Sequence, residues 1–186
     1  MATALVGTAR APTARLSDGC GRPTDWPVPN ATLAAHVVAL VNGDRRRHGL
    51  PGLAASATLT RAAQWKASHM ARYRYMRHND PAPPVKRTVA TRLAACGYPT
   101  TRTTWGENIA FGYATPAAVM KAWLRSRDHR LNIEFPRFAA IGVGAAQATN
   151  GVVYWTEDFG SYTGAPPGRT RPRPTPPPPP PPPPGG

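Results

Sequence analysis

The apolar residues of this chain change their spacing once along the sequence, and this change restricts the fold more than any other feature. Between residues 30 and 126 they recur mainly every three or four positions, the period of a helix with one buried face. From residue 139 to 160 they alternate with the period of a strand, on either side of Asn150-Gly151, a dipeptide typical of hairpin turns. Helices followed by a hairpin predict an α+β layered domain.

Local signals place the boundaries of the expected elements. Asn30 or Thr32 can cap the first helix, Gly49 can end it, and Thr115 with Pro116 is typical of the start of another helix. The predicted elements are helices over residues 30–49, 57–76 and 115–126, a short helix over 88–95, a strand over 107–111 and the hairpin 139–160.

The two ends of the chain differ in composition from the middle. Residues 1–29 are rich in Pro, Gly, Thr and Arg and lack a period, so we expect a loosely ordered segment apart from an anchor at Cys20. Residues 163–186 end in an unbroken run of prolines, Pro176 to Pro184, which can hold a polyproline II rod of roughly 28 Å. The chain thus divides into an N-terminal segment, one domain over 30–162 and a proline-rich disordered tail.

The formal net charge is +14, from 23 basic and 9 acidic residues spread along the chain. This charge favours anionic partners such as lipid headgroups and acidic cell-wall polymers. Sequence-specific nucleic-acid binding is not expected, because helix-turn-helix, zinc-finger and basic-zipper patterns are missing. The apolar runs are shorter than the roughly 20 residues of a transmembrane span, and an export signal is not visible at the start. We expect a monomer.

Two cysteines, Cys20 and Cys96, lie outside any CxxC spacing, and two thiols alone cannot complete a structural zinc site. A disulfide between them would close a loop of about 75 residues and stabilise the fold by on the order of 4 kcal/mol. Their spacing is equally compatible with two unrelated thiols, so it leaves both possibilities open.

The familiar catalytic motifs of hydrolases, metalloproteases, phosphate-binding loops and dinucleotide-binding turns are missing from the sequence. The stretch "WGENIAFG" instead places Glu107 inside an apolar run. His78 stands where the second helix gives way to a loop, and His129 follows the last predicted helix. Three separate segments therefore offer two imidazoles and one carboxylate.

Three interpretations of Glu107, His78 and His129 are open at this point. The trio has the ligand types of zinc or a similar divalent ion with a position open for water. Glu107 can instead orient a neutral imidazole through a hydrogen bond. It can also satisfy backbone donors in a buried turn, which spacing alone favours. The other histidines are expected to face solvent, to lie at a helix end or to be packed: His36, His48 and His69.

Several linked motifs carry a resemblance to a known family. They are "VNGDRRRHGLPGL", "MRHND", "WGENIAFG", "VMKAWLRSRDHRLNI", "IGVG" and "VVYWTEDFG". Residues 30–162 resemble the CAP superfamily of cysteine-rich secretory proteins, antigen 5 and plant pathogenesis-related 1 proteins, and are most similar to its bacterial SCP-like branch. The resemblance implies an α-β-α sandwich, with a small antiparallel sheet between helical layers and a large open cleft.

The resemblance also implies a cleft site. In the family a helix-end histidine and the glutamate of the GEN motif bind divalent metal, and these positions are His78 and Glu107 here. The bacterial SxxHRxNI pattern implies that His129 is the second cleft histidine. The eukaryotic GHYTQVVW pattern is absent, so we expect an incomplete site that binds zinc, calcium or magnesium weakly. Further cleft or motif residues implied by the patterns are Asn108, Ser126 and Asn132.

The resemblance finally implies an exported protein, extracellular or at the cell surface, with Cys20 and Cys96 paired. We expect a binding or effector module for lipid or wall polymer. The alternative is a metal-assisted hydrolase or protease with His78, Glu107 and His129 as its catalytic candidates. A third possibility is a scaffold that is positioned by the proline tail.

Overall fold

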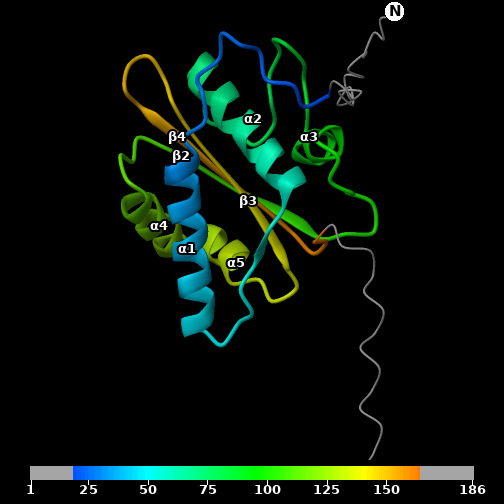
Figure 1. Ribbon diagram of the computed structural model, residues 1–186, viewed down its shortest axis with the longest axis vertical. Coiled ribbons are helices and arrows are strands. Elements are labelled where there is room, and N and C mark those ends of the chain that lie inside the picture. The colour runs from blue at the N-terminus through cyan, green and yellow to red at the C-terminus, as the bar shows by residue number, and fades with distance from the viewer. Residues whose placement is uncertain (1–18, 164–186) are drawn as a thin grey trace, which may run out of the picture.

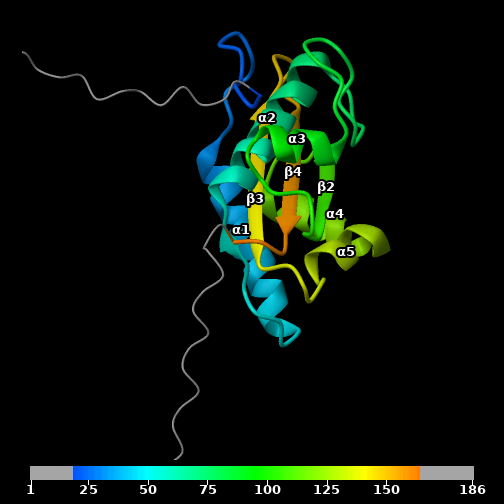
Figure 2. The same cartoon turned by 90° about the vertical axis from the view of Figure 1, so that its right-hand side faces the viewer.

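The computed structural model describes residues 19–163. Its strands form one four-stranded sheet in the order β1-β3-β4-β2, and Figure 2 shows β3, β4 and β2 side by side. The elements in chain order are α1 (Ala31–Arg47), β1 (Ala54–Ala55), α2 (Ala57–Tyr73), α3 (Val89–Ala95), β2 (Trp105–Phe111), α4 (Pro116–Arg125), α5 (Arg127–Ile133), β3 (Ala140–Gln147) and β4 (Val153–Gly160). None of the helices in this range is long and apolar enough to cross a membrane.

The three longer strands pair antiparallel, as the family resemblance implied, and the short β1 adds one parallel pair, so the sheet is mixed. Strand β4 pairs antiparallel with β3 and β2, whereas β1 pairs parallel with β3. After α1 the chain runs beside β3 for only two residues, Ala54 and Ala55, before Ser56 caps α2. Both alanines are exposed, so this short strand has no alternation of apolar and polar residues by which the sequence could predict it.

Helices cover both faces of the sheet, as expected for the α-β-α sandwich (Figure 1). On one face α2 lies very close to β3, and glycines in β3 permit this approach. A Cβ atom at Gly142 would lie only 2.1 Å from the backbone carbon of Leu59. A Cβ atom at Gly144 would likewise lie 2.2 Å from the carbonyl oxygen of Ala63. On the other face α1 and α4 close the main core, whose members include Val37, Val41, Val119, Trp123, Val143 and Trp155.

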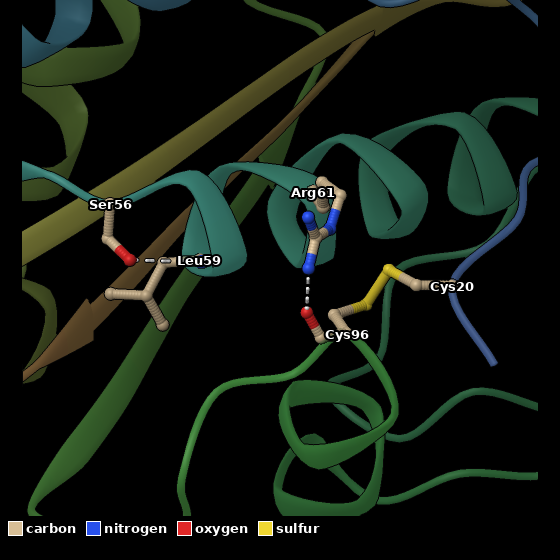
Figure 3. The surroundings of a disulfide bond; sticks show 5 residues. All are labelled: Cys20, Ser56, Leu59, Arg61 and Cys96. Carbon is tan, nitrogen blue, oxygen red and sulfur yellow. Dashed lines mark hydrogen bonds between the residues drawn. A yellow bond between two sulfur atoms is a disulfide. The ribbon is translucent and has the colours of Figure 1, made fainter. Parts of the chain in front are cut away.

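A disulfide joins Cys20 to Cys96, which confirms the pairing that the resemblance implied (Figure 3). Beside it, the Arg61 guanidinium donates to the Cys96 carbonyl oxygen at 2.6 Å. Further along, Trp26 is 3% exposed and packs edge-on against Trp65. The described part of the N-terminal segment therefore packs onto α2. The expectations for residues 1–18 and for the proline tail lie outside the described residues.

Most predicted helix boundaries are confirmed. Asn30 caps α1 by accepting from the Leu33 amide, and Thr115 caps α4 in the same way. Helix α2 ends at Tyr73, before the predicted residue 76, because Arg74 adopts a left-handed φ of 53°. The hairpin and β2 are confirmed, with Gly151 at a φ of 83° in the turn.

Helix α5 was not predicted. Ser126 is at once the C-cap of α4 and the N-cap of α5, and its side chain makes no capping hydrogen bond. Only Ile133 of the seven residues in α5 is buried, so the helix has no apolar stripe from which to recognise it.

Candidate functional site

Strand β2 distributes the GEN motif between the two faces of the sheet, because successive strand residues point in opposite directions. Glu107 pairs with Asp158 of β4 and faces the side covered by α2 and α3. Asn108 pairs with Glu157 and faces the side covered by α5, where its amide donates to the His129 carbonyl oxygen at 3.0 Å. One strand thus carries two separate polar clusters.

Both carboxylate oxygens of Glu107 are engaged. Oε1 lies 2.8 Å from Nδ1 of His78, and Oε2 accepts from the guanidinium of Arg92. A carboxylate only accepts hydrogen bonds, so Nδ1 carries the hydrogen and the lone pair of a neutral His78 ring lies on Nε2. The Glu107 side chain is 2% exposed and that of His78 is 52% exposed. This contact matches the interpretation in which a buried Glu107 orients an accessible imidazole.

A buried ion network lies behind this pair. Asp80 Oδ1 accepts from Lys66 Nζ at 2.8 Å and from Arg92 at 2.7 Å, and all three side chains are fully buried. Lys66 and Arg92 also donate to the His78 carbonyl oxygen, at 3.0 and 3.2 Å. The two cations therefore hold the backbone of His78 while Glu107 holds its ring, which is the kind of support that orients a functional histidine.

Asp158 completes the network as a buried acid. Among the described residues neither of its carboxyl oxygens has a hydrogen-bond partner. Burial raises the pKa of Asp158 well above its ordinary value, and the negative charge of Glu107 raises it further, against the opposing charges of Arg92 and Lys66. Asp158 is thus the third acid, beside Asp80 and Glu107, that lies against the two buried cations Lys66 and Arg92.

The second cluster holds α5 onto the sheet. Asn108 donates to Glu157 Oε2 at 3.0 Å, and Asn132 donates to the Asn108 side-chain oxygen at 2.9 Å. Burial raises the pKa of Glu157 to about 8, although the hydrogen bond from Asn108 lowers it in part. Asn108 and Asn132, which the family motifs singled out, thus place the backbone of His129. Glu157 and Asp158 were not among the predicted site residues, although two adjacent acids within the apolar stretch "VVYWTEDF" are a visible signal.

His129 lines a groove of about 260 Å³. Burial lowers the pKa of His129, and the nearby charge of His78 lowers it further, whereas Asp128 raises it. The groove is otherwise mainly apolar, and its lining residues are Met76, Ile109, Ala110, Phe111, Tyr113, Ala122, Trp123, Ser126 and His129.

The predicted metal ligands are not all in mutual contact. His78 and Glu107 form a direct hydrogen bond, whereas His129 does not complete a group of ligand atoms with them in the described part of the chain. Within residues 19–163, a single trio of histidine and acidic residues has ligand atoms that all lie within 4.8 Å of one another, and it is elsewhere: Asp44, His48 and Glu134.

Comparison with known proteins identifies the family of this chain. The model of CAP, the cysteine-rich secretory protein family, matches residues 38–159. The chain is 35% identical over 136 residues to the uncharacterized protein YkwD of Bacillus subtilis (strain 168), a match that covers 73% of this chain. The chain spans about half the length of this curated relative, since the match covers 50% of it.

Solved structures agree in fold. An extracellular protein containing an SCP domain from Bacillus anthracis str. Ames superimposes with a TM-score of 0.60 at 26% identity, covering 69% of this chain and 40% of that one. An outer surface protein from Borrelia burgdorferi superimposes with a TM-score of 0.61 over 72% of this chain and 97% of its own, but its 20% identity supports the fold alone. The chain therefore belongs to the cysteine-rich secretory protein (CAP) family, among its bacterial members with SCP domains.

Proposed function

We propose that this protein is an extracellular or cell-surface binding module that takes up an apolar group, such as a lipid acyl chain, in the groove beside His129. The observation that carries this proposal is the apolar lining of the groove, in which Met76, Phe111 and Tyr113 are 47%, 49% and 38% exposed. Large apolar side chains that are exposed together are typical of interaction sites.

The size of the groove restricts its occupant. At about 260 Å³ it lies just below the usual range of roughly 300–1,000 Å³ for small-molecule sites, so it suits one apolar segment rather than a whole lipid or polymer. The net charge of +14 would attract the anionic remainder of such a ligand to the surface.

The extracellular location rests on two supports. One structural relative is described as an extracellular protein and another as an outer surface protein. The disulfide between Cys20 and Cys96 also fits an oxidising compartment, because such bonds persist mainly outside the cytosol.

The cleft donors fit a divalent ion in part. His78 and His129 would supply imidazole nitrogens, which suit zinc better than calcium or magnesium. Glu107 would be the carboxylate of the site, but Arg92 and His78 already occupy its oxygens, so its main contribution would be to orient His78. Water would complete such a site, and we expect weak binding.

A fluorescent fatty acid, dansyl-undecanoic acid, tests the groove directly. We expect the Met76→Ser, Phe111→Ser double variant to bind it at least about tenfold more weakly, since about 1.4 kcal/mol of lost apolar burial suffices for this change. Leu131→Ser is the matched control, because Leu131 is 51% exposed and does not line the groove. Equal affinities in the wild type and the double variant would refute the proposal.

Metal-assisted hydrolysis is the second candidate, and the contact between His78 and Glu107 is the observation that favours it. A histidine oriented by a carboxylate is a common general base. A His78→Ala protein distinguishes the two functions without unpairing the buried Arg92, because the His78 side chain is 52% exposed. A hydrolase would lose turnover of peptide or wall-polymer substrates, whereas a binding module would keep its affinity for the fatty acid.

A further inference from the structure

We propose that Asp44, His48 and Glu134 form a divalent-cation site where the end of α1 meets the end of α5, independent of the cleft. Asp44 lies in the last turn of α1, His48 is the C-cap of that helix, and Glu134 is the C-cap of α5. One ligand atom from each of the three lies within 4.8 Å of those of the other two. Imidazole nitrogens and carboxylate oxygens are both zinc ligands, and a zinc ion with three protein ligands takes water in its remaining position.

His48 is already oriented for this role. Its Nδ1 lies 3.0 Å from the Asp44 carbonyl oxygen, which can only accept, so a neutral ring carries its hydrogen on Nδ1 and its lone pair on Nε2. Nε2 is the nitrogen nearer to Glu134, with Oε1 at 3.9 Å. Histidines that bind metals commonly donate their other N–H to a backbone carbonyl in this way. The His48 side chain is 53% exposed, which leaves room for the ion and water to enter.

Asp44 supplies an independent sign that a ligand is needed. Its side chain is only 5% exposed, and Oδ1 accepts from the Arg47 guanidinium at 3.0 Å. Its other oxygen, Oδ2, is shielded from solvent and makes no hydrogen bond to any described residue, while His48 Nδ1 lies 3.5 Å from it. A buried carboxylate oxygen without a hydrogen bond is unfavourable, and a cation held by Asp44 Oδ2, the lone pair on His48 Nε2 and Glu134 would satisfy it.

Arg45 makes the arrangement rigid. Its guanidinium is fully buried and donates to the carbonyl oxygens of Ile133 at 2.8 Å and Phe135 at 3.0 Å, the residues on either side of Glu134. The helix that carries Asp44 and His48 is thereby held at a set distance from Glu134. Tetrahedral zinc with bonds of about 2.1 Å separates its ligand atoms by roughly 3.4 Å, so movements of about 1 Å or less would close the site.

Zinc titration of the full chain tests the site, with calorimetry for affinity and the NMR signals of the histidine ring nitrogens for location. The His78→Ala, His129→Ala double variant provides a background without the cleft imidazoles. In this background we expect zinc to bind and to shift the His48 ring signals. Adding His48→Ala, Asp44→Asn or Glu134→Gln should weaken binding at least about tenfold, since even the loss of supporting contacts to a metal ligand costs 10–100-fold.

His36→Ala is the matched control, because His36 is an exposed histidine on the same helix and is not part of the trio. It should leave zinc affinity unchanged. The proposal is overturned if zinc does not bind in the double-variant background, or if the His48 signals respond to pH alone, which would make His48 only an imidazolium between two carboxylates. The cleft site is tested separately in the His48→Ala background, so either site can fail without the other.

Discussion

At the scale of single residues, the stability of the buried face formed by β2 and β4 depends on pairs of opposite charges. Glu107 contacts Arg92, and Arg92 and Lys66 share Asp80. Removing one member of such a set leaves a buried charge without a partner, which typically destabilises a protein by 3–5 kcal/mol. The network that stabilises the fold therefore also fixes the position of His78.

Glu157 gives this protein a specific dependence of stability on pH. Its pKa is about 8 in the folded state against 4.5 ordinarily, so between these values the native state binds a proton that the unfolded state lacks. Its contribution to stability should therefore fall as pH rises through this window, by up to about 1.4 kcal/mol per pH unit. Urea unfolding measures the free energy of unfolding of the wild type and of Glu157→Gln at each pH. We expect this free energy to depend less on pH in the variant.

The comparison is best made between pH 6.5 and 8. Burial lowers the pKa values of His69 and His129 below 6.5, so these groups make stability rise with pH only below that value. Asp158 acts in the same direction as Glu157, so Asp158→Asn is a useful companion variant. Identical pH slopes in the wild type and in Glu157→Gln would contradict the assignment.

At the scale of elements, strand β2 connects the two polar clusters of the site. Strand β2 supplies Glu107 to one face and Asn108 to the other, and α3 and α5 are the short helices whose polar residues meet them. Both helices have only seven residues and would be marginal alone, so their stability comes from these tertiary contacts.

The N-terminal segment is another element whose order depends on a tertiary contact. The disulfide spans 76 residues, and the chain-entropy model gives about 4.5 kcal/mol for a loop of this size. We expect the Cys20→Ser, Cys96→Ser double variant to lose stability of this order in guanidinium unfolding. The wild type in reducing buffer should match the variant, and equal stability of the oxidised and reduced wild type would contradict the prediction.

At the scale of the whole molecule, the net charge of +14 should govern encounter with anionic surfaces. We expect the full chain to bind vesicles of phosphatidylcholine and phosphatidylglycerol but not vesicles of pure phosphatidylcholine. Raising the salt from about 0.1 M to about 1 M shortens the Debye length from about 10 Å to about 3 Å and should release the protein.

Sedimentation of the vesicles measures this binding. The Met76→Ser, Phe111→Ser variant should keep the same salt dependence, because the charge acts on encounter rather than within the groove. Vesicle binding that does not change with salt would show that the charge is not the cause.

Much of the fold could be predicted from the sequence because its signals are local. The stripe of α1, the Asn150-Gly151 turn and the alternation in β3 each depend on residues a few positions apart. The two missed elements, β1 and α5, lack such a signal, since Ala54 and Ala55 are exposed and α5 buries only Ile133.

The sequence by itself determined the helices α1 to α4, the hairpin and the motif that carries Glu107, because periodicity and capping act over short distances along the chain. Only the tertiary structure decided which partners Glu107 has, and that Arg45 reaches residues about 90 positions away to hold Glu134 near His48. Buried charges are unfavourable without a partner, and those partners come from segments that meet only when the layers pack. Their pairing therefore leaves no period in the sequence.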